Sequence, residues 1–231
     1  MPQQTGSARS YELFLIAVIA ARATSFIFSK MILESLAPFN LLAVRFIIAF
    51  VLLALIFNKA VRSLAARDLL AGTVIGTAFF ITMACEMIAL TQAASSLVSL
   101  LENCAIIFVP LLEILLYKKL PGKLTVISTG IAMLGVVLLA LGQGELSGGF
   151  TWGLAAGLCY AAAIIVTERL SHGSIATLGI GIVQVGTMGV LSFLAMLLTE
   201  TPQLPQSGSQ WLMLAMLIIV CTGFGFTLQP M

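Results

Sequence analysis

The chain of 231 residues is 60% hydrophobic and 9% charged, and its formal net charge is +2. A soluble domain is typically about 45–50% apolar and about 25% charged, so this composition excludes an ordinary globular protein and indicates a membrane protein. A charge balance this close to neutral gives no reason to expect a nucleic-acid partner.

Apolar stretches long enough to form membrane helices recur along the whole chain. About 20 helical residues cross the roughly 30 Å hydrocarbon core of a bilayer. The sequence predicts eight spans with short connections, over residues 11–33, 38–57, 69–90, 92–117, 123–141, 150–169, 174–198 and 210–228. The predicted fold class is an all-α membrane protein, a polytopic helical bundle in the lipid bilayer.

The first predicted span allows a second interpretation. A basic residue followed by the apolar run Leu13–Ala21 and small residues is also typical of a cleavable signal peptide. The apolar run resumes after Arg22, however, through Phe26, Ile27 and Phe28. This continuation favours a first transmembrane helix.

Basic residues outside the predicted spans or at their terminal positions all fall on one side of the membrane. Numbering the connections alternately, one side receives Arg9, Lys59, Arg62, Arg67, Lys118, Lys119, Lys123 and Arg169. The other side receives no lysine or arginine, only Glu34, Glu145 and Glu200. The positive-inside rule therefore predicts that both termini are cytoplasmic, in an integral multi-pass protein of the cell (inner) membrane.

A shift of 139 residues aligns the chain with itself in hydropathy. Spans 11–33, 38–57 and 69–90 then fall on 150–172, 177–196 and 208–229, Lys30 falls on Arg169, and Arg45 falls on Gln184. The repeating unit holds five spans, so the second copy must be inverted in the membrane, as in many secondary transporters. The predicted domains are residues 1–141, a first repeat of five helices, and 150–231, a second repeat truncated to three.

Two GxxxG motifs lie within predicted spans, at Gly72 and Gly76 and at Gly153 and Gly157. Small residues at this spacing let helix backbones approach closely in lipid. We interpret both motifs as packing sites within the chain.

Six charged residues lie inside the predicted spans, apart from the four at or next to a span end (Glu12, Lys123, Glu168 and Arg169). A charge near the bilayer centre costs about 2.5–3.5 kcal/mol, so such residues normally face a bundle interior or a water-filled path. The six are Arg22, Lys30, Arg45, Glu86, Glu102 and Glu113. Lys30 and Glu113 lie near span ends, and for these two we favour an interfacial position.

Depth suggests how the remaining charges are arranged. Arg22 and Glu102 lie at compatible depths, and Arg45 and Glu86 both lie in the outer third of their spans. The candidate substrate-binding or pathway residues are Arg22, Arg45, Glu86, Glu102, Asn103 and Gln184. Such a set could bind a polar or zwitterionic solute; alternatively, the charges are ion pairs that only lock helices together.

Several segments resemble the EamA-like branch of the drug/metabolite transporter superfamily. These are AARATSFIFSK (20–30), LAPFNLLAVRFIIAF (36–50), the run 93–141 with FVPLLE and GIAMLGVVLL, and WGLAAGLCYAAAIIVTERL (152–170). The resemblance implies ten helices in two inverted halves, with Lys30 and Arg45 at the family's usual basic positions. It also implies a secondary-active exporter of small metabolites, such as amino acids or drug-like solutes, that works by alternating access.

Three departures from the family pattern affect this expectation. Members usually carry a tryptophan–glycine pair in the first helix, where this chain has Ala21–Arg22, and many carry a glutamate where it has Lys118. The ninth and tenth helices have no counterpart in the sequence. The alternative is therefore a truncated, non-transporting membrane protein or scaffold subunit that needs a completing partner or forms a homodimer.

Motifs of the main enzyme classes are absent from the sequence. It contains no HExxH, GxSxG, CxxC or GxxxxGK[ST] pattern, and we predict that it is not an enzyme and needs no cofactor or metal. The four cysteines, Cys85, Cys104, Cys159 and Cys221, all lie in apolar runs, where packing is their expected role.

Overall fold

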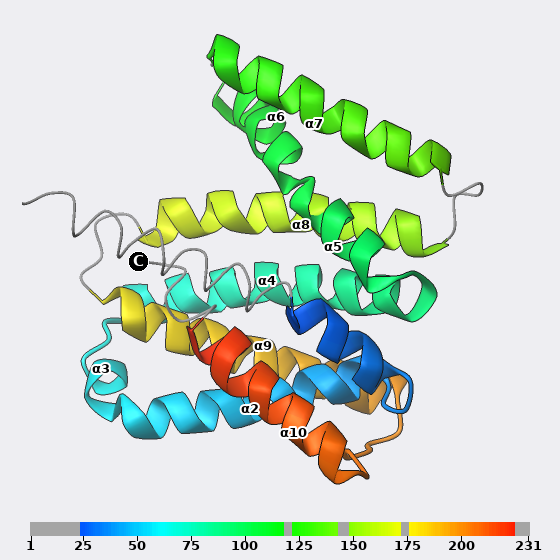
Figure 1. Cartoon of the computed structure of the whole chain (residues 1–231). Coiled ribbons are helices and arrows are strands. Elements are labelled where there is room, and N and C mark those ends of the chain that lie inside the picture. Colours follow the sequence, from blue (N-terminus) through cyan, green and yellow to red (C-terminus); the bar gives the residue numbers. More distant parts are fainter. Residues whose placement is uncertain (1–23, 118–121, 143–147, 172–175, 225–231) are drawn as a thin grey trace, which may run out of the picture.

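The computed structural model describes residues 24–117, 122–142, 148–171 and 176–224 (Figure 1). Its helices are the segment Thr24–Leu33, α2 (Pro38–Ile56), α3 (Asn58–Arg62), α4 (Ala66–Gln92), α5 (Ser95–Asn103), α6 (Ala105–Tyr117), α7 (Lys123–Gly142), α8 (Gly148–Ser171), α9 (Thr177–Thr199), α10 (Gly208–Met216) and the π-helix η1 (Leu217–Phe224). These ranges contain no strand, which confirms the prediction of an all-α bundle.

Five helical stretches in the described ranges are long and apolar enough to cross a membrane. They are Pro38–Ile56, Ala66–Gln92, Ser95–Leu116, Gly148–Ser171 and Thr177–Thr199. The other three predicted spans contain the shorter apolar helices Thr24–Leu33, Thr125–Gly135 and Gly208–Ile219. The protein is thus a polytopic membrane bundle, and the total of eight spans stays a prediction.

Local sequence explains where several helices begin. Pro38 opens α2, where the missing N–H costs nothing because the first turn has no helical acceptor. The Asp68 carboxylate accepts the Ala65 N–H at 3.2 Å before α4. At α10, the Ser207 hydroxyl accepts the Gln210 N–H at 3.3 Å and the Gln210 side chain accepts the Ser207 N–H, which forms a capping box.

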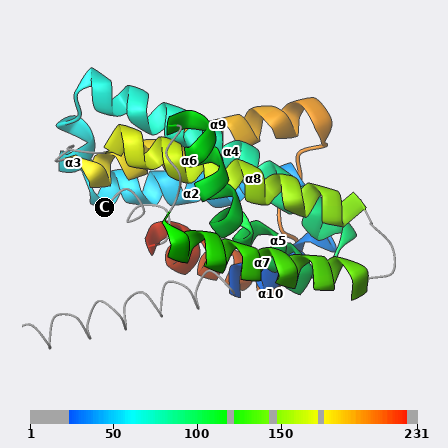
Figure 2. The same ribbon diagram turned by 90° about the horizontal axis from the view of Figure 1, so that it is seen from above.

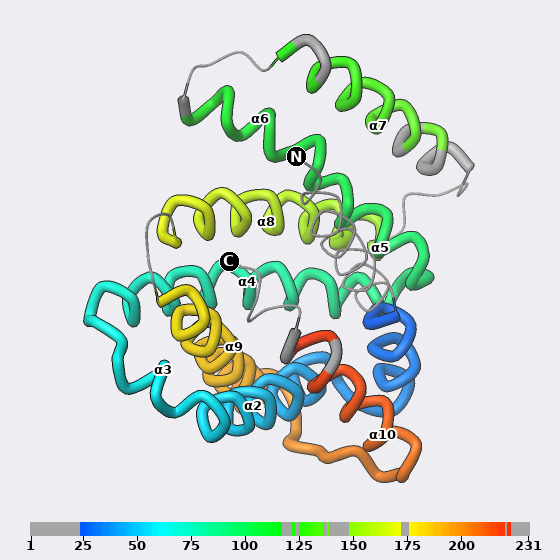
Figure 3. The backbone as a smooth tube through the Cα atoms, turned by 60° about the vertical axis from the view of Figure 1, so that its left-hand side comes forward, coloured from blue at the N-terminus to red at the C-terminus, as the bar shows by residue number. Residues whose placement is uncertain are grey.

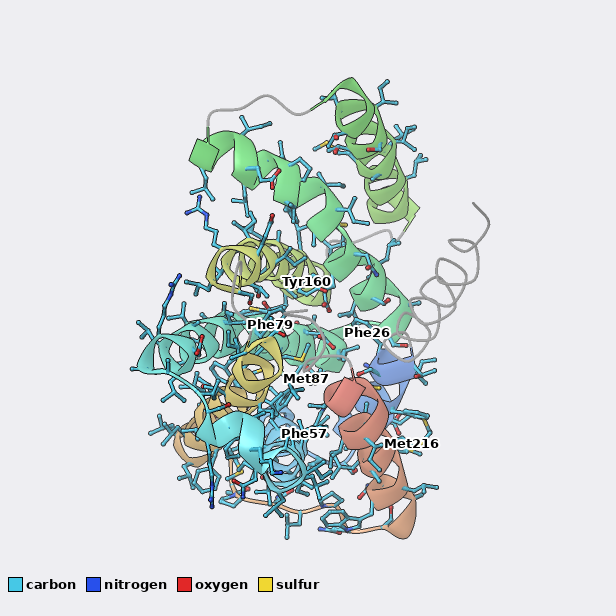
Figure 4. The ribbon with its side chains drawn as sticks, turned by 90° about the vertical axis from the view of Figure 1, so that its left-hand side faces the viewer. Phe26, Phe57, Phe79, Met87, Tyr160 and Met216 are labelled. Atoms are coloured by element: carbon cyan, nitrogen blue, oxygen red, sulfur yellow. The ribbon has the colours of Figure 1, made fainter. Side chains whose placement is uncertain are left out.

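Helix α4 occupies the middle of the bundle, with α8 on one side and α2 and α9 on the other (Figures 1 and 2). The Phe79 ring of α4 meets the Tyr160 ring of α8 edge-on, with centroids 6.0 Å apart (Figure 4). Phe79 and Met87 are fully buried. The apolar core therefore follows α4, and the helices that span the membrane pack around it.

Glycines allow the closest helix contacts. A Cβ at Gly76 of α4 would lie 2.7 Å from the Gln184 carbonyl oxygen of α9, and one at Gly157 of α8 would lie 2.5 Å from the Leu101 carbonyl oxygen of α5. Both distances are impossible for a real side chain. The GxxxG motifs thus pack against helices of the same chain, as predicted.

Helices α6 and α7 form an arm at the edge of the bundle (Figures 1 and 3). Helix α7 packs mainly on α6, which in turn contacts α8. The α7 side chains Ile127, Ile131, Leu134 and Leu138 are exposed. In a membrane these apolar surfaces contact lipid chains, so exposed leucine and isoleucine here need no protein partner.

Two predicted elements differ from the structure. The connection 58–68 contains the short helix α3, and the span 92–117 is interrupted at Cys104, between α5 and α6. Pro110 lies inside the continuous helix α6. The interruption therefore falls six residues before the proline, where α5 contacts α8.

Candidate functional site

Arg45 lies inside the bundle on α2, with 2% of its surface exposed. Its Nε donates a hydrogen bond to the Thr222 hydroxyl of η1 at 2.8 Å. Its guanidinium carbon also lies 5.2 Å from the centroid of the Phe46 ring. A buried guanidinium in a membrane bundle needs polar partners, and η1 supplies one of them.

The π-helix η1 explains how Thr222 reaches this position. The Thr222 hydroxyl donates to the Leu217 carbonyl oxygen at 3.0 Å and accepts a hydrogen bond from Arg45. Its carbonyl acceptor lies five residues earlier, the same offset as in the backbone hydrogen bonds of a π-helix. Short π segments often occur at functional sites. We predicted an ordinary helix over 210–228 and did not identify Thr222 as a candidate site residue. A polar residue within an apolar run was the available signal in the sequence, and Arg45, its partner, lies 177 residues away.

Glu86 and Glu102 lie on either side of the tight connection between α4 and α5, and each is 2% exposed. Glu86 is about 9 Å from the end of α4, and Glu102 is about 10 Å from the start of α5, at 1.5 Å per residue. The hairpin therefore brings both carboxylates to similar depth. The predicted pair Arg45–Glu86 stays a prediction, and so does Arg22–Glu102, because Arg22 lies outside the described residues.

Glu102 lies close to the backbone of α8. A Cβ at Gly157 would be 3.5 Å from the Glu102 Cα. Asn103, the next residue, is exposed, and its Nδ2 donates to the Ser99 carbonyl oxygen of its own helix at 2.7 Å. The two neighbours thus occupy different surroundings, one inside the bundle and one on its surface.

Gln184 on α9 is fully buried, and both polar atoms of its side chain lack a hydrogen-bond partner in the described part of the chain. Ser192, eight residues later on the same helix, is also fully buried, and its hydroxyl has no hydrogen-bond partner among the described residues. With Met188 between them, these residues follow the four-residue spacing of one helix face. Sequence analysis found Gln184 and missed Ser192, since serines in membrane helices are common.

Helices α2 and α9 run antiparallel along a shared seam (Figure 3). Gly186 packs against the Phe50 ring, and Gly189 packs against the backbone of Phe46 and Ile47. This register places Ser192 at about the depth of Arg45, whereas Gln184 lies about 12 Å further along α9. The structure therefore brings Arg45 and Ser192 to one level and leaves Gln184 at another.

Lys30, for which we favoured an interfacial position, contacts the C-terminal end of α4. It is partly buried, and its Nζ donates to the carbonyl oxygens of Leu90 and, at 3.1 Å, of Ala93. These carbonyls belong to the C-terminal end of α4, where a helix lacks internal donors and carries partial negative charge. Lys30 thus caps α4. Glu113 is partly buried on α6, near its end.

Replacing Lys30 with methionine is expected to lower the free energy of unfolding by about 1 kcal/mol. The methionine keeps the apolar stem but removes the cation from the α4 carbonyls, and contacts of this kind contribute about that much. Thermal unfolding in detergent measures the change. The control is Lys59→Met on the exposed helix α3; equal effects of both changes would contradict the capping role.

The four cysteines form no disulfide bond, and Cys85 of α4 lies close enough to Cys159 of α8 for the two thiols to interact. In the described residues, no group of three or more histidine, cysteine, aspartate or glutamate side chains could hold a metal ion.

Comparison with known proteins identifies a family of membrane transporters. The model of the EamA-like transporter family matches residues 9–141, more than half of the chain. No curated protein matches the sequence.

Proposed function

The chain belongs to the EamA-like transporter family, and we propose that it is a secondary-active exporter of small polar metabolites, such as amino acids or drug-like solutes. Transport would proceed by alternating access between two inverted repeats, residues 1–141 and 150–231. Both termini would lie in the cytoplasm, since the basic connections share one side.

Helix packing supports the proposed repeat. Under the 139-residue shift, α2 corresponds to α9, and α4 corresponds to α10 with η1. The contact of α4 with α9 then corresponds to the contact of η1 with α2, and both contacts are present. Helices α2 and α9, which correspond to each other in the two repeats, form the seam between these units. Inverted repeats commonly hold their substrate at such a seam.

The observation that carries the proposal is the buried polar side chains on the helices at this seam. Arg45, Gln184 and Ser192 each expose at most 2% of their surface, although lipid-facing positions of the same helices are apolar. Intramembrane polar residues of this kind are expensive and usually functional.

All candidate residues except Asn103 have a proposed role in binding. Arg45 would bind the carboxylate of a zwitterionic solute, and Glu86 and Glu102 would attract its ammonium group. Gln184 would donate to and accept from the solute at the other level of the seam. Arg22 would line the path to these groups, and Asn103, on the bundle surface, has no role in this proposal.

Replacing Arg45 with methionine is expected to reduce transport at least about tenfold while the protein still folds. An apolar side chain of similar length fills the space, and size-exclusion chromatography selects the folded protein, because removing one partner of a buried charge pair can destabilise a fold. A single lost charge-assisted contact with a solute corresponds to a factor of about ten or more. Uptake of labelled amino acids into proteoliposomes measures the loss.

The control for this experiment is Arg62→Met on α3, an exposed residue away from the seam. Its transport should match the parent. Equal flux through the Arg45→Met variant and the parent would contradict the proposed site. If the parent itself moves no solute while correctly folded, the alternative of a non-transporting subunit that needs a partner is favoured.

A further inference from the structure

A cluster of hydrogen bonds joins the two proposed repeats at one end of the seam. The Glu200 carboxylate, just after α9, accepts the Phe39 N–H at 3.0 Å and the Asn40 N–H at 2.9 Å. It also accepts the Asn40 side-chain amide at 2.8 Å. Glu200 therefore places a carboxylate on the free N–H groups of the first turn of α2, where the helix dipole favours negative charge.

Asn40 completes the connection from the other side. Its Nδ2 also donates to the Thr201 carbonyl oxygen at 3.0 Å, and its Oδ1 accepts the Gln203 N–H at 2.6 Å. Asn40 is fully buried, so its amide is satisfied by the segment that follows α9. We call Asn40, Glu200, Thr201 and Gln203 the seam latch.

The opposite end of the seam is closed differently. There, a Cβ at Gly179 of α9 would lie 2.5 Å from Leu64 Cδ2 and 3.2 Å from the Ala60 carbonyl oxygen. That contact is steric and largely apolar. The latch, in contrast, consists of hydrogen bonds that water can replace when the helices separate.

The latch lies directly above the buried polar level of the seam. Asn40 precedes Arg45 by about 8 Å along α2, and Glu200 follows Ser192 by about 12 Å along α9. A solute entering or leaving through this end would have to part α2 from α9 here. With both termini cytoplasmic, this end faces outward.

We propose that Glu200 and Asn40 form the outer gate of the transport path, and that breaking their hydrogen bonds opens the seam to the level of Ser192. The role of this gate in transport rests on the proposed function. The opening of the seam itself can be tested separately, because it can be measured without a known solute.

The test uses Ser192→Cys as a reporter for access to the seam. Cysteine has similar size, and the Ser192 hydroxyl has no partner to lose in the described residues. A membrane-impermeant maleimide is added from the outer side, and the labelling rate is corrected for the parent protein with its native cysteines. Labelling of Ser192→Cys alone should be slow.

Adding Glu200→Gln is expected to raise the labelling rate about tenfold, which corresponds to losing roughly 1.4 kcal/mol of closed-state stability. Glutamine replaces one carboxylate oxygen with an NH₂ group, which cannot accept a hydrogen bond. One backbone N–H of α2 that Glu200 accepts would then face another donor. The matched control is Glu34→Gln, an exposed carboxylate close in sequence to α2, which should leave the rate unchanged.

Asn40→Asp provides a second way to break the latch. It places a negative charge against Glu200 and should also accelerate labelling, so a folding failure of Glu200→Gln leaves the proposal testable. Size-exclusion chromatography identifies the folded variants. A folded latch variant whose labelling rate equals that of Ser192→Cys alone would overturn the gate and leave Glu200 as a helix cap. Faster labelling of the latch variants, together with no detectable solute flux through the parent protein, would support the gate and count against the transport function alone.

Discussion

Replacing Gly157 with alanine is expected to lower the free energy of unfolding by about 1–3 kcal/mol, the usual cost of overpacking. The new Cβ would lie 2.5 Å from the Leu101 carbonyl oxygen. A backbone atom cannot rotate away as a side chain can, so α5 would have to move from α8. Because Glu102 lies in that part of α5, its buried position should change as well.

Two glycines of α7 provide a control of opposite sign. Gly130 and Gly135 have open space around the position of a Cβ. Alanine there gains helix propensity without a clash, so Gly130→Ala should stabilise the protein by up to about 1 kcal/mol. Thermal unfolding in the same detergent compares the variants. If Gly157→Ala were as stable as Gly130→Ala, the close packing of α5 on α8 would be wrong.

Replacing Gln184 with leucine is expected to raise the free energy of unfolding by about 1–3 kcal/mol and to impair transport. Removing a buried donor and acceptor that have no partners removes their desolvation penalty. Leucine has similar size and suits a fully buried position of α9. A more stable but less active protein is the expected signature of a polar group kept for binding a solute.

Unfolding in detergent and flux in proteoliposomes are both needed for this variant. Gln92→Leu, at the exposed end of α4, is the control, and its stability should stay within about 0.5 kcal/mol of the parent. Destabilisation by Gln184→Leu would mean that the amide makes a contact that stabilises the fold. Higher stability with unchanged flux would remove Gln184 from the proposed site and leave the fold as described.

Hydropathy and charge along the chain were enough to predict the fold class and the approximate limits of the membrane helices. The thickness of the bilayer sets the length of an apolar helix, and this requirement acts on each segment separately. Helices α2, α4, α8 and α9 therefore begin and end within three residues of the predicted spans. The burial of Arg45, Glu86 and Glu102 was predictable for the same reason, because ionised side chains avoid lipid.

Which polar groups contact one another could not be predicted from hydropathy and became visible in the folded bundle. The bond from Arg45 to Thr222, the cap of Lys30 on α4 and the contact of Glu200 with α2 join residues 60 to 177 positions apart. Each depends on how neighbouring helices are rotated and shifted, which hydropathy does not encode. The interruption at Cys104 and the π-helix at Leu217–Phe224 likewise depend on packing. Span lengths follow from local interactions with lipid, whereas polar partners follow from the arrangement of the whole bundle.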